Sequence, residues 1–246
     1  MSLLEAVVGL GDDALVLGQR LSAWCGKSPW LEEDLAVANT ALDFLGRARL
    51  LYGYAEALGG CDEDAYAFQR DAGAFTNLLI YELPCADFAA SCARQFLVDA
   101  FDALHLERMS ESADAELAGI AAKAHKEALY HRRRSAAWLV RLGDGTAESR
   151  CRVQQAVEDV WGYHAELFTP VEAEAGLIAK GVLPDRAALR PQWLAAVTAT
   201  LDEATLAPPC ADWRIDGGRQ GLHTEHLGPM LAEMQHLHRS HPGARW

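Results

Sequence analysis

The stretch that most constrains the fold of this chain runs from residue 31 to residue 58, LEEDLAVANTALDFLGRARLLYGYAEAL. Apolar residues recur in steps of four and three, at Leu31, Leu35, Ala38, Leu42 and Leu45. This spacing places them on one side of a helix. The stretch therefore predicts a long helix, with this side and the strip beside it turned towards a helical core.

A second strip on the same helix carries Asn39, Asp43 and Gly46. Asp43 and Gly46 are three residues apart, so their side chains would lie over one another. In di-iron four-helix bundles a Glu-x-x-His pair occupies such a position and holds metal in the core. Here the carboxylate is present and the histidine is absent.

The rest of the chain has the same helical spacing and almost no alternation of the kind found in strands, which predicts an all-α fold. We expect a ferritin-like four-helix bundle core with additional C-terminal helices. The single domain 1–246 would have its core at about 3–170 and its C-terminal extension at about 171–246. The expected helices are 3–25, 31–58, 87–109, 114–142, 147–168, 193–201 and 227–239.

Four carboxylates fall on successive long helices in this interpretation. They are Asp13, Asp43, Asp99 and Glu127. Their order matches two helical hairpins joined by a longer crossover, the arrangement that supplies ligands to a di-iron centre. Such a centre uses carboxylate oxygens and imidazoles together.

The expected imidazoles are missing. Gly46 and Tyr130 stand three residues after Asp43 and Glu127, and His131 is one residue too late. We therefore interpret the set as vestigial and expect no metal, catalytic or cofactor-binding residue. Its members are Asp13, Asp43, Gly46, Asp99, Glu127, Tyr130 and His131.

Two other interpretations of these acids remain open. In the first, they form buried ion pairs, since buried charges need partners. The candidate arginines for that role are Arg47, Arg49, Arg94, Arg132, Arg133 and Arg134. In the second, the chain is a metal-binding ferritin-like oxidase in its own right. Its ligands would be Asp43, Asp99, Glu127 and His131.

Histidines elsewhere offer weaker metal candidates. Asp102 and His105 form a D-x-x-H, and Glu233 and His236 form an E-x-x-H, but neither pattern has a second copy at bundle spacing. We expect both to be surface or helix-packing pairs. Five histidines lie in the C-terminal segment, where a solvated or partner-facing helix is the expected setting, and the role of residues 223–226 stays open. They are His223, His226, His236, His238 and His241.

The composition indicates which binding partners and which cellular compartment to expect for this chain. The net charge of -13 disfavours nucleic acid and anionic membrane surfaces. The six cysteines have no C-x-x-C spacing and the first twenty residues have no basic leader, so we expect reduced thiols in a cytoplasmic protein. No G-x-S-x-G elbow, phosphate-binding G-x-x-x-x-G-K or dinucleotide fingerprint is present.

Several segments together resemble a known family. They include LGDDALVLGQRLSAWCG, LAVANTALDFLGRARLLYGYAEALGG and, most specifically, GLHTEHLGPMLAEMQHLHRSHPGARW. They are similar to the structural, non-catalytic subunits of bacterial ring-1,2-phenylacetyl-CoA epoxidases, the multicomponent oxygenases of aerobic phenylacetate breakdown. The resemblance extends from about residue 10 to the end.

The resemblance implies a ferritin-like subunit without iron of its own. It would pair with the catalytic di-iron subunit, commonly as a two-plus-two heterotetramer, together with a small accessory subunit. A reductase carrying FAD and an iron-sulfur centre would supply electrons, and the complex would epoxidise phenylacetyl-CoA. No catalytic residue carries over, because Gly46 and Tyr130 stand at ligand positions.

Such a subunit would bury an apolar and aromatic helix face of its partner. We expect an obligate interface on the order of 2,000 Å² or more. The aromatic residues that could anchor it, although each is also a candidate for the core, are Trp30, Tyr52, Tyr54, Trp161 and Trp193.

Overall fold

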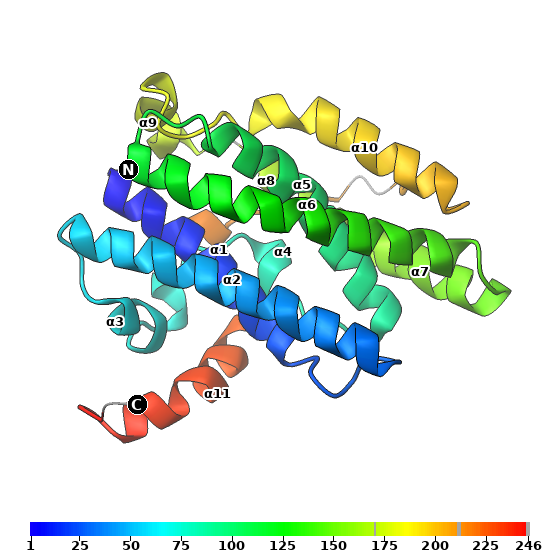
Figure 1. The fold of residues 1–246 in the computed structure, drawn as a ribbon, viewed down its shortest axis with the longest axis horizontal. Helices are drawn as coiled ribbons and strands as arrows, with labels where there is room; N and C mark the ends of the chain where they lie inside the picture. The colour runs from blue at the N-terminus through cyan, green and yellow to red at the C-terminus, as the bar shows by residue number, and fades with distance from the viewer. Residues whose placement is uncertain (170, 211–212, 245–246) are drawn as a thin grey trace. The chain divides into compact units, whose positions relative to one another are not determined.

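The computed structural model describes residues 1–169, 171–210 and 213–244. Every regular element in these ranges is an α-helix or a 3-10 helix, and no strand occurs in them (Figure 1). The all-α class is confirmed, and the helices are consistent with a ferritin-like bundle. Residue 170, where the core was expected to end, lies outside the described ranges.

The chain groups into two compact units. The first holds residues 1–84 and 217–246, and the second holds residues 85–216. The C-terminal segment is therefore divided, because its last thirty residues belong with the N-terminal helices. That all 246 residues form one domain remains a prediction.

The first unit is built on two long helices, α1 (Leu3–Ser22) and α2 (Leu31–Ala57), which run side by side in Figure 1. Its shorter elements are α3 (Glu63–Phe68), η1 (Ala72–Ala74), α4 (Leu79–Glu82), η4 (Gly218–Gln220) and α11 (Leu227–Ser240). Glycines on α1 let α2 approach closely. A Cβ on Gly11 would lie 2.5 Å from the Tyr52 ring, and one on Gly18 would lie 2.9 Å from Leu45. Both distances are too short for a methyl group, so larger residues there would push the helices apart.

The apolar stripe of α2 does not face the core, and this part of the sequence interpretation was wrong. Leu31, Leu35 and Leu42 are 71%, 56% and 63% exposed, and Ala38 and Leu45 are half-buried. The buried side of α2 is a different strip. It contains Val37, Ala41, Phe44, Ala48, Leu51 and Ala55. Two sides of this helix are apolar, and the spacing alone did not show which one packs inward.

The second unit contains the other two long helices, α5 (Phe88–Met109) and α6 (Ala115–Gly143), followed by α7 (Ala147–Trp161). Its shorter elements are α8 (His164–Phe168), η2 (Glu172–Glu174), α9 (Ala175–Ala179), η3 (Ala187–Leu189) and α10 (Arg190–Glu203). The helix expected over 147–168 is interrupted after Trp161, so it forms two helices. Asp87 and Thr146 accept hydrogen bonds from the first turns of α5 and α7, as expected of N-caps.

The interior of the second unit is formed by a small-residue seam and an aromatic cluster. One seam of α6 is buried throughout, at Leu117, Ala121, Ala124, Ala128, His131, Ser135 and Trp138. Trp193 lies in the cluster, where its indole donates to the carbonyl of Leu97 at 3.1 Å and its ring stacks on His164. Trp161 and Trp193 are thus core residues, whereas Trp30 is 55% exposed.

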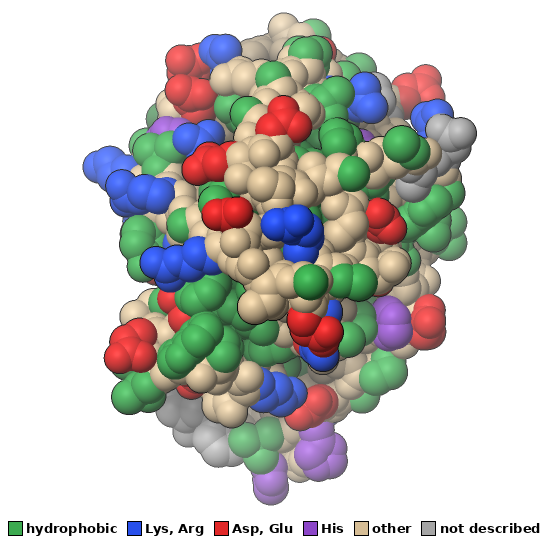
Figure 2. Space-filling view, turned by 90° about the vertical axis from the view of Figure 1, so that its right-hand side faces the viewer, with side chains coloured by type: hydrophobic (Ala, Val, Ile, Leu, Met, Phe, Trp, Pro, Cys, Tyr) green, Lys and Arg blue, Asp and Glu red, His purple; other side chains and the backbone are tan. Residues whose placement is uncertain are grey.

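The surface drawn in Figure 2 mixes acidic, basic and apolar side chains, without a broad field of one sign on its coloured part. Among the described residues, no helix is both long and apolar enough to cross a bilayer.

Candidate functional site

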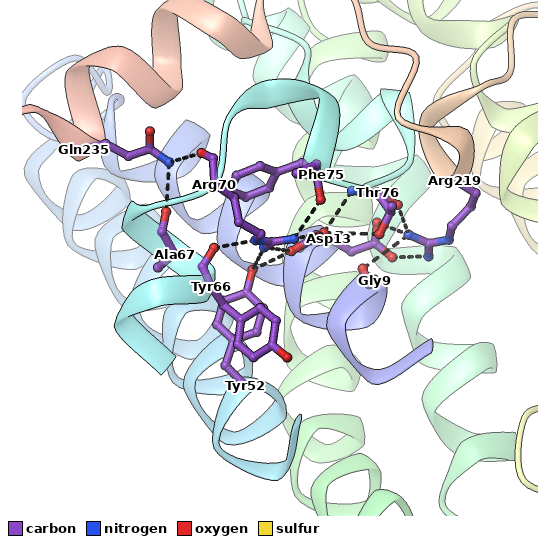
Figure 3. A network of polar contacts seen from close by, with 12 residues as sticks. Gly9, Asp13, Tyr52, Tyr66, Ala67, Arg70, Phe75, Thr76, Arg219 and Gln235 are labelled. Carbon is purple, nitrogen blue, oxygen red and sulfur yellow. Dashed lines mark hydrogen bonds and ion pairs between the residues drawn. The ribbon is translucent and has the colours of Figure 1, made fainter. Parts of the chain in front are cut away.

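Two adjacent aspartates on α1 form the centre of a polar network inside the first unit (Figure 3). Asp13, one of the expected metal ligands, is buried and pairs with Arg219. Its Oδ1 accepts hydrogen bonds from Arg219 Nη1 at 3.0 Å and from the Leu78 amide at 2.8 Å, and its Oδ2 accepts from Arg219 Nη2. Both oxygens are therefore engaged, and a metal ion there would have to displace a guanidinium.

Asp12 is fully buried beside Asp13 but has separate partners. Arg70 pairs with it, the Tyr52 hydroxyl donates to its Oδ1 at 2.6 Å, and the Thr76 amide donates to its Oδ2 at 2.8 Å. Each of two neighbouring buried carboxylates thus has its own arginine, which is what burial of two charges requires.

The surroundings of Asp12 favour the ionised form of Arg70. The Arg70 guanidinium lies 4.1 Å from the centre of the Phe75 ring. Burial alone would lower the pKa of Arg70, but the hydrogen bonds and charge of Asp12 raise it above its usual value. Burial, with the charge of Asp12, raises the pKa of Tyr52 well above its usual value. At neutral pH the Tyr52 hydroxyl therefore keeps its proton and remains a donor.

A third polar cluster in this unit joins Glu82 of α4 to the C-terminal segment. His223 Nδ1 lies 2.8 Å from Glu82 Oε2, and His223 Nε2 lies 2.9 Å from the Phe75 carbonyl oxygen. Both ring nitrogens face acceptors, so the imidazolium satisfies both contacts. Burial alone would lower the pKa of His223, but the Glu82 and Phe75 contacts raise it. His223 is therefore a buried ion-pair residue, and the expectation of a solvated or partner-facing setting was wrong for it.

Asp99 on α5, in the second unit, is a buried carboxylate of a different kind. Gln95 donates to its Oδ1 at 2.7 Å, Ser135 makes a second polar contact, and the described part of the chain shows no ion pair between Asp99 and an arginine or lysine. Burial raises the pKa of Asp99 to about 7, against polar contacts with Ser135 and Gln95 that lower it. A metal ion could bind this carboxyl group only after it loses its proton.

The other expected ligand positions differ widely in burial. Asp43, Gly46 and Glu127 are half-buried, and a Cβ built on Gly46 meets nothing within 4 Å. His131 is buried, but Tyr130 beside it is 49% exposed. Within the described residues, no group of three or more His, Cys, Asp or Glu side chains lies in an arrangement that could hold a metal ion. The residues present do not fit a di-iron centre.

The two weaker metal patterns have different settings. Asp102 and His105 are buried, and the His105 ring stacks on Phe101, so this pair packs inside the unit. Glu233 and His236 are exposed on α11. The first is thus a helix-packing pair and the second a surface pair.

The interpretation of the acids as buried ion pairs is confirmed for Asp13, but the arginine differs from those expected. Asp13 pairs with Arg219, which lies 206 residues away in the sequence. Asp12 and its partner Arg70 were missed altogether. The available signal was the Asp-Asp dipeptide within an otherwise apolar helix, since two adjacent buried acids need two cations.

Comparison with known proteins bears on the whole chain. The family model for PaaA_PaaC, phenylacetic acid catabolic protein, matches residues 1–246. The chain belongs to this phenylacetic acid catabolic family. It is also 50% identical, over 238 residues, to a protein of Escherichia coli (strain K12) that is named as a subunit of 1,2-phenylacetyl-CoA epoxidase. The aligned part covers 96% of each protein. Membership in the phenylacetic acid catabolic family confirms the resemblance seen in the sequence.

Proposed function

We propose that this chain is the non-catalytic structural subunit of a multicomponent di-iron monooxygenase that epoxidises the ring of phenylacetyl-CoA. The main support is its 50% identity, over 96% of both chains, to a protein named as a subunit of that epoxidase. Its task is to hold the catalytic subunit in its active shape. The complex contains this chain and the catalytic subunit as a heterotetramer, a small accessory subunit and a reductase with FAD and an iron-sulfur centre, all in the cytoplasm.

The chemistry of the expected ligands supports the non-catalytic role. Asp13 is bound to Arg219, and Gly46 has no side-chain donor atom. Iron in a bundle of this kind needs several ionised carboxylates and imidazoles that converge on it. The iron that performs the oxygenation therefore belongs to the partner.

A test measures iron and turnover in the chain alone and in the complex. We expect the purified chain to contain far less than one iron per molecule and to show no epoxidation with phenylacetyl-CoA and reductase. Adding it to the catalytic subunit should raise both the activity and the thermal unfolding midpoint of that subunit. Asp99→Asn should leave the activity of the complex unchanged, because this residue serves packing and not iron binding.

If the chain is instead a metal-binding oxidase in its own right, the result should differ. That function would require near-stoichiometric iron or manganese in the isolated chain, bound by Asp43, Asp99, Glu127 and His131. Loss of that metal in Asp99→Asn and His131→Gln, with the fold intact by circular dichroism, would overturn the proposed role.

A further inference from the structure

A cleft of about 760 Å³ opens on the surface of the second unit, between three of its helices. Its floor is an apolar part of α5, where Phe96 and Ala100 lie one helical turn apart. One wall is α6, and the other is α10, which contributes Ala196 and Thr200. These α10 side chains are small, so the cleft stays open. Its volume is in the range of about 300 to 1,000 Å³ that is typical of small-molecule sites.

The α6 wall of this cleft is basic. Lys126, Tyr130 and Arg133 succeed one another in steps of four and three, so they lie along one side of the helix. Arg132 also lines the cleft and is half-buried. We define the α6 basic wall as these four residues. Among the described residues that line the cleft, none is acidic.

The cations of the α6 basic wall have no carboxylate partner. In the described part of the chain, no ion pair joins Lys126, Arg132 or Arg133 to an acid. The two arginines were among those expected to neutralise buried acids, but they line the cleft instead. Exposed arginines elsewhere in this unit are paired, since Arg108 and Arg152 lie 3.7 and 2.7 Å from carboxylates. In a chain with 35 acidic and 22 basic residues, three unpaired cations around one cleft are unexplained by the fold.

We infer that this cleft binds a small organic diphosphate that carries a flat ring, as a nucleoside diphosphate does. Lys126 and Arg133 are seven residues apart, which is about 10 Å along α6, so the positive charge suits an extended anion better than a single ion. Guanidinium groups bind phosphate oxygens through paired hydrogen bonds. Tyr130 lies between the two cations and is 49% exposed, so its ring is accessible for stacking on the flat ring of the ligand.

The charge of the whole chain favours a small anion over a polymeric one. The net charge is -13, so a nucleic acid or an acidic protein that extends past the cleft would be repelled by the surrounding surface. A ligand of nucleotide size stays beside the α6 basic wall. The inference does not depend on the proposed function, because it uses only the residues of this cleft.

The first test compares four probes by isothermal titration calorimetry with the full-length chain. We expect ADP to bind in the micromolar range. Adenosine has the ring without phosphates and pyrophosphate has the phosphates without a ring, so each should bind at least about tenfold more weakly than ADP. Coenzyme A carries the same adenine-linked diphosphate. Tighter binding of coenzyme A than of ADP would support the site with a coenzyme A derivative as its ligand, and equal binding would support it with the nucleotide part alone as the recognised group.

A pair of double variants tests whether binding occurs at the α6 basic wall. Arg132→Gln/Arg133→Gln removes two charges from the cleft and should weaken ADP binding at least about tenfold. Arg108→Gln/Arg152→Gln is the matched control, because it removes two arginine charges from the same unit outside the cleft. This control should bind ADP as the wild type does. Circular dichroism checks that both variants keep the fold.

Two single variants test the ring and the space of the cleft without changing its charge. In Tyr130→Ala, the affinity for ADP should fall towards that for pyrophosphate, whereas the affinity for pyrophosphate itself should not change. In Ala196→Leu, a larger side chain enters the cleft from α10, so ADP should bind at least about tenfold more weakly although all three cations remain. Leucine is a good helix former, so α10 should be retained.

Three results would overturn the inference and leave the proposed function standing. The first is that neither ADP nor coenzyme A binds the wild-type chain at about 1 mM. The second is an equal loss of ADP binding in the two double variants, which would show a general attraction of anions to surface charge. The third is adenosine binding as tightly as ADP, which would show that the phosphates are not recognised.

Discussion

Asp13 and Asp99 occupy corresponding places in the expected ligand set, yet the chain buries them in two different ways. Asp13 on α1 keeps its charge, because Arg219 binds both of its oxygens. Asp99 on α5 has no such partner, and its pKa is raised to about 7 by burial. One acid is balanced by a cation and the other by a proton.

This difference shows what governs the charge of a buried carboxylate. Its own helix fixes where the acid lies, but the supply of a cation from another part of the chain decides its charge. The two cases also give opposite responses to mutation and to pH.

The largest expected effect comes from breaking the ion pair of Asp13. Asp13→Ala leaves Arg219 buried without its partner, which we expect to lower the free energy of unfolding by about 3 to 5 kcal/mol. Urea denaturation followed by circular dichroism measures this. The double variant Asp13→Ala/Arg219→Met removes both charges and should recover part of the loss. A loss below about 1 kcal/mol for Asp13→Ala, the usual value for an exposed pair, would contradict the assignment.

Asp99→Asn should act in the opposite direction. The unfolded carboxyl has a pKa near 3.8 and the folded one about 7, so between these pH values only the folded chain holds the proton. The stability of the wild-type chain therefore falls as pH rises from about 4 to 7. At pH 8 the variant should be more stable than the wild type by on the order of 2 kcal/mol. The pKa shift of Asp99 sets an upper limit of about 4 kcal/mol on this difference.

The measurement for Asp99→Asn is a series of denaturation curves from pH 5 to pH 8. The difference between the variant and the wild type should grow through this range. An equal effect at pH 5 and pH 8 would show that Asp99 does not change its protonation state in this range, which would contradict the raised pKa.

His223 provides a smaller, pH-dependent case. The folded pKa of His223 is raised, so its contribution is complete below about pH 6.5 and is lost as pH rises through the folded value. Burial alone would raise the pKa of its partner Glu82, but hydrogen bonds from His223, Asn77 and Thr224 lower it. The contribution of Glu82 is therefore present above about pH 4.5 and is lost only in more acidic solution.

His223→Ala should thus destabilise the chain more at pH 6 than at pH 9, by a difference of about 1 kcal/mol. Thermal unfolding at the two pH values tests this. His236→Ala is the matched control, since His236 is exposed on α11, and it should show the same small effect at both. A pH-independent loss for His223→Ala would mean that the neutral imidazole makes the same contacts.

The smallest expected effect comes from an exposed pair. The Arg49 side chain is 76% exposed and lies 3.2 Å from Glu63. Arg49→Ala should change the free energy of unfolding by less than about 0.5 kcal/mol. In 0.5 M salt even this difference should disappear, because exposed charges are screened. A loss of stability that persists in 0.5 M salt would show that Arg49 stabilises the fold by more than an exposed ion pair.

Much of the secondary structure could be predicted from the sequence, because its signals are local. The expected helices at 87–109 and 114–142 occur as Phe88–Met109 and Ala115–Gly143. Asp87 and Thr146 are N-caps because a short polar side chain reaches amides three residues ahead. The break after Trp161 was missed, since Gly162 is the only local mark of it.

For the candidate site, the sequence predicted buried acids but not the residues that pair with them. Acids at Asp13 and Asp99 were expected in the interior, and both are buried. Their partners were not predicted, because Arg219 reaches Asp13 across 206 residues. No spacing rule connects positions so far apart, and only the path of the chain brings them together.

By itself, the sequence determined the helices, the family and the shortage of imidazoles beside Asp43 and Glu127, because composition and spacing along one helix contain that information. The tertiary structure alone decided which side of α2 packs inward and how each buried acid is neutralised. Leu35 and Phe44 are both apolar residues of one helix, yet the first is exposed and the second is buried. The physical reason is that burial and charge balance are set by neighbours contributed by distant parts of the chain.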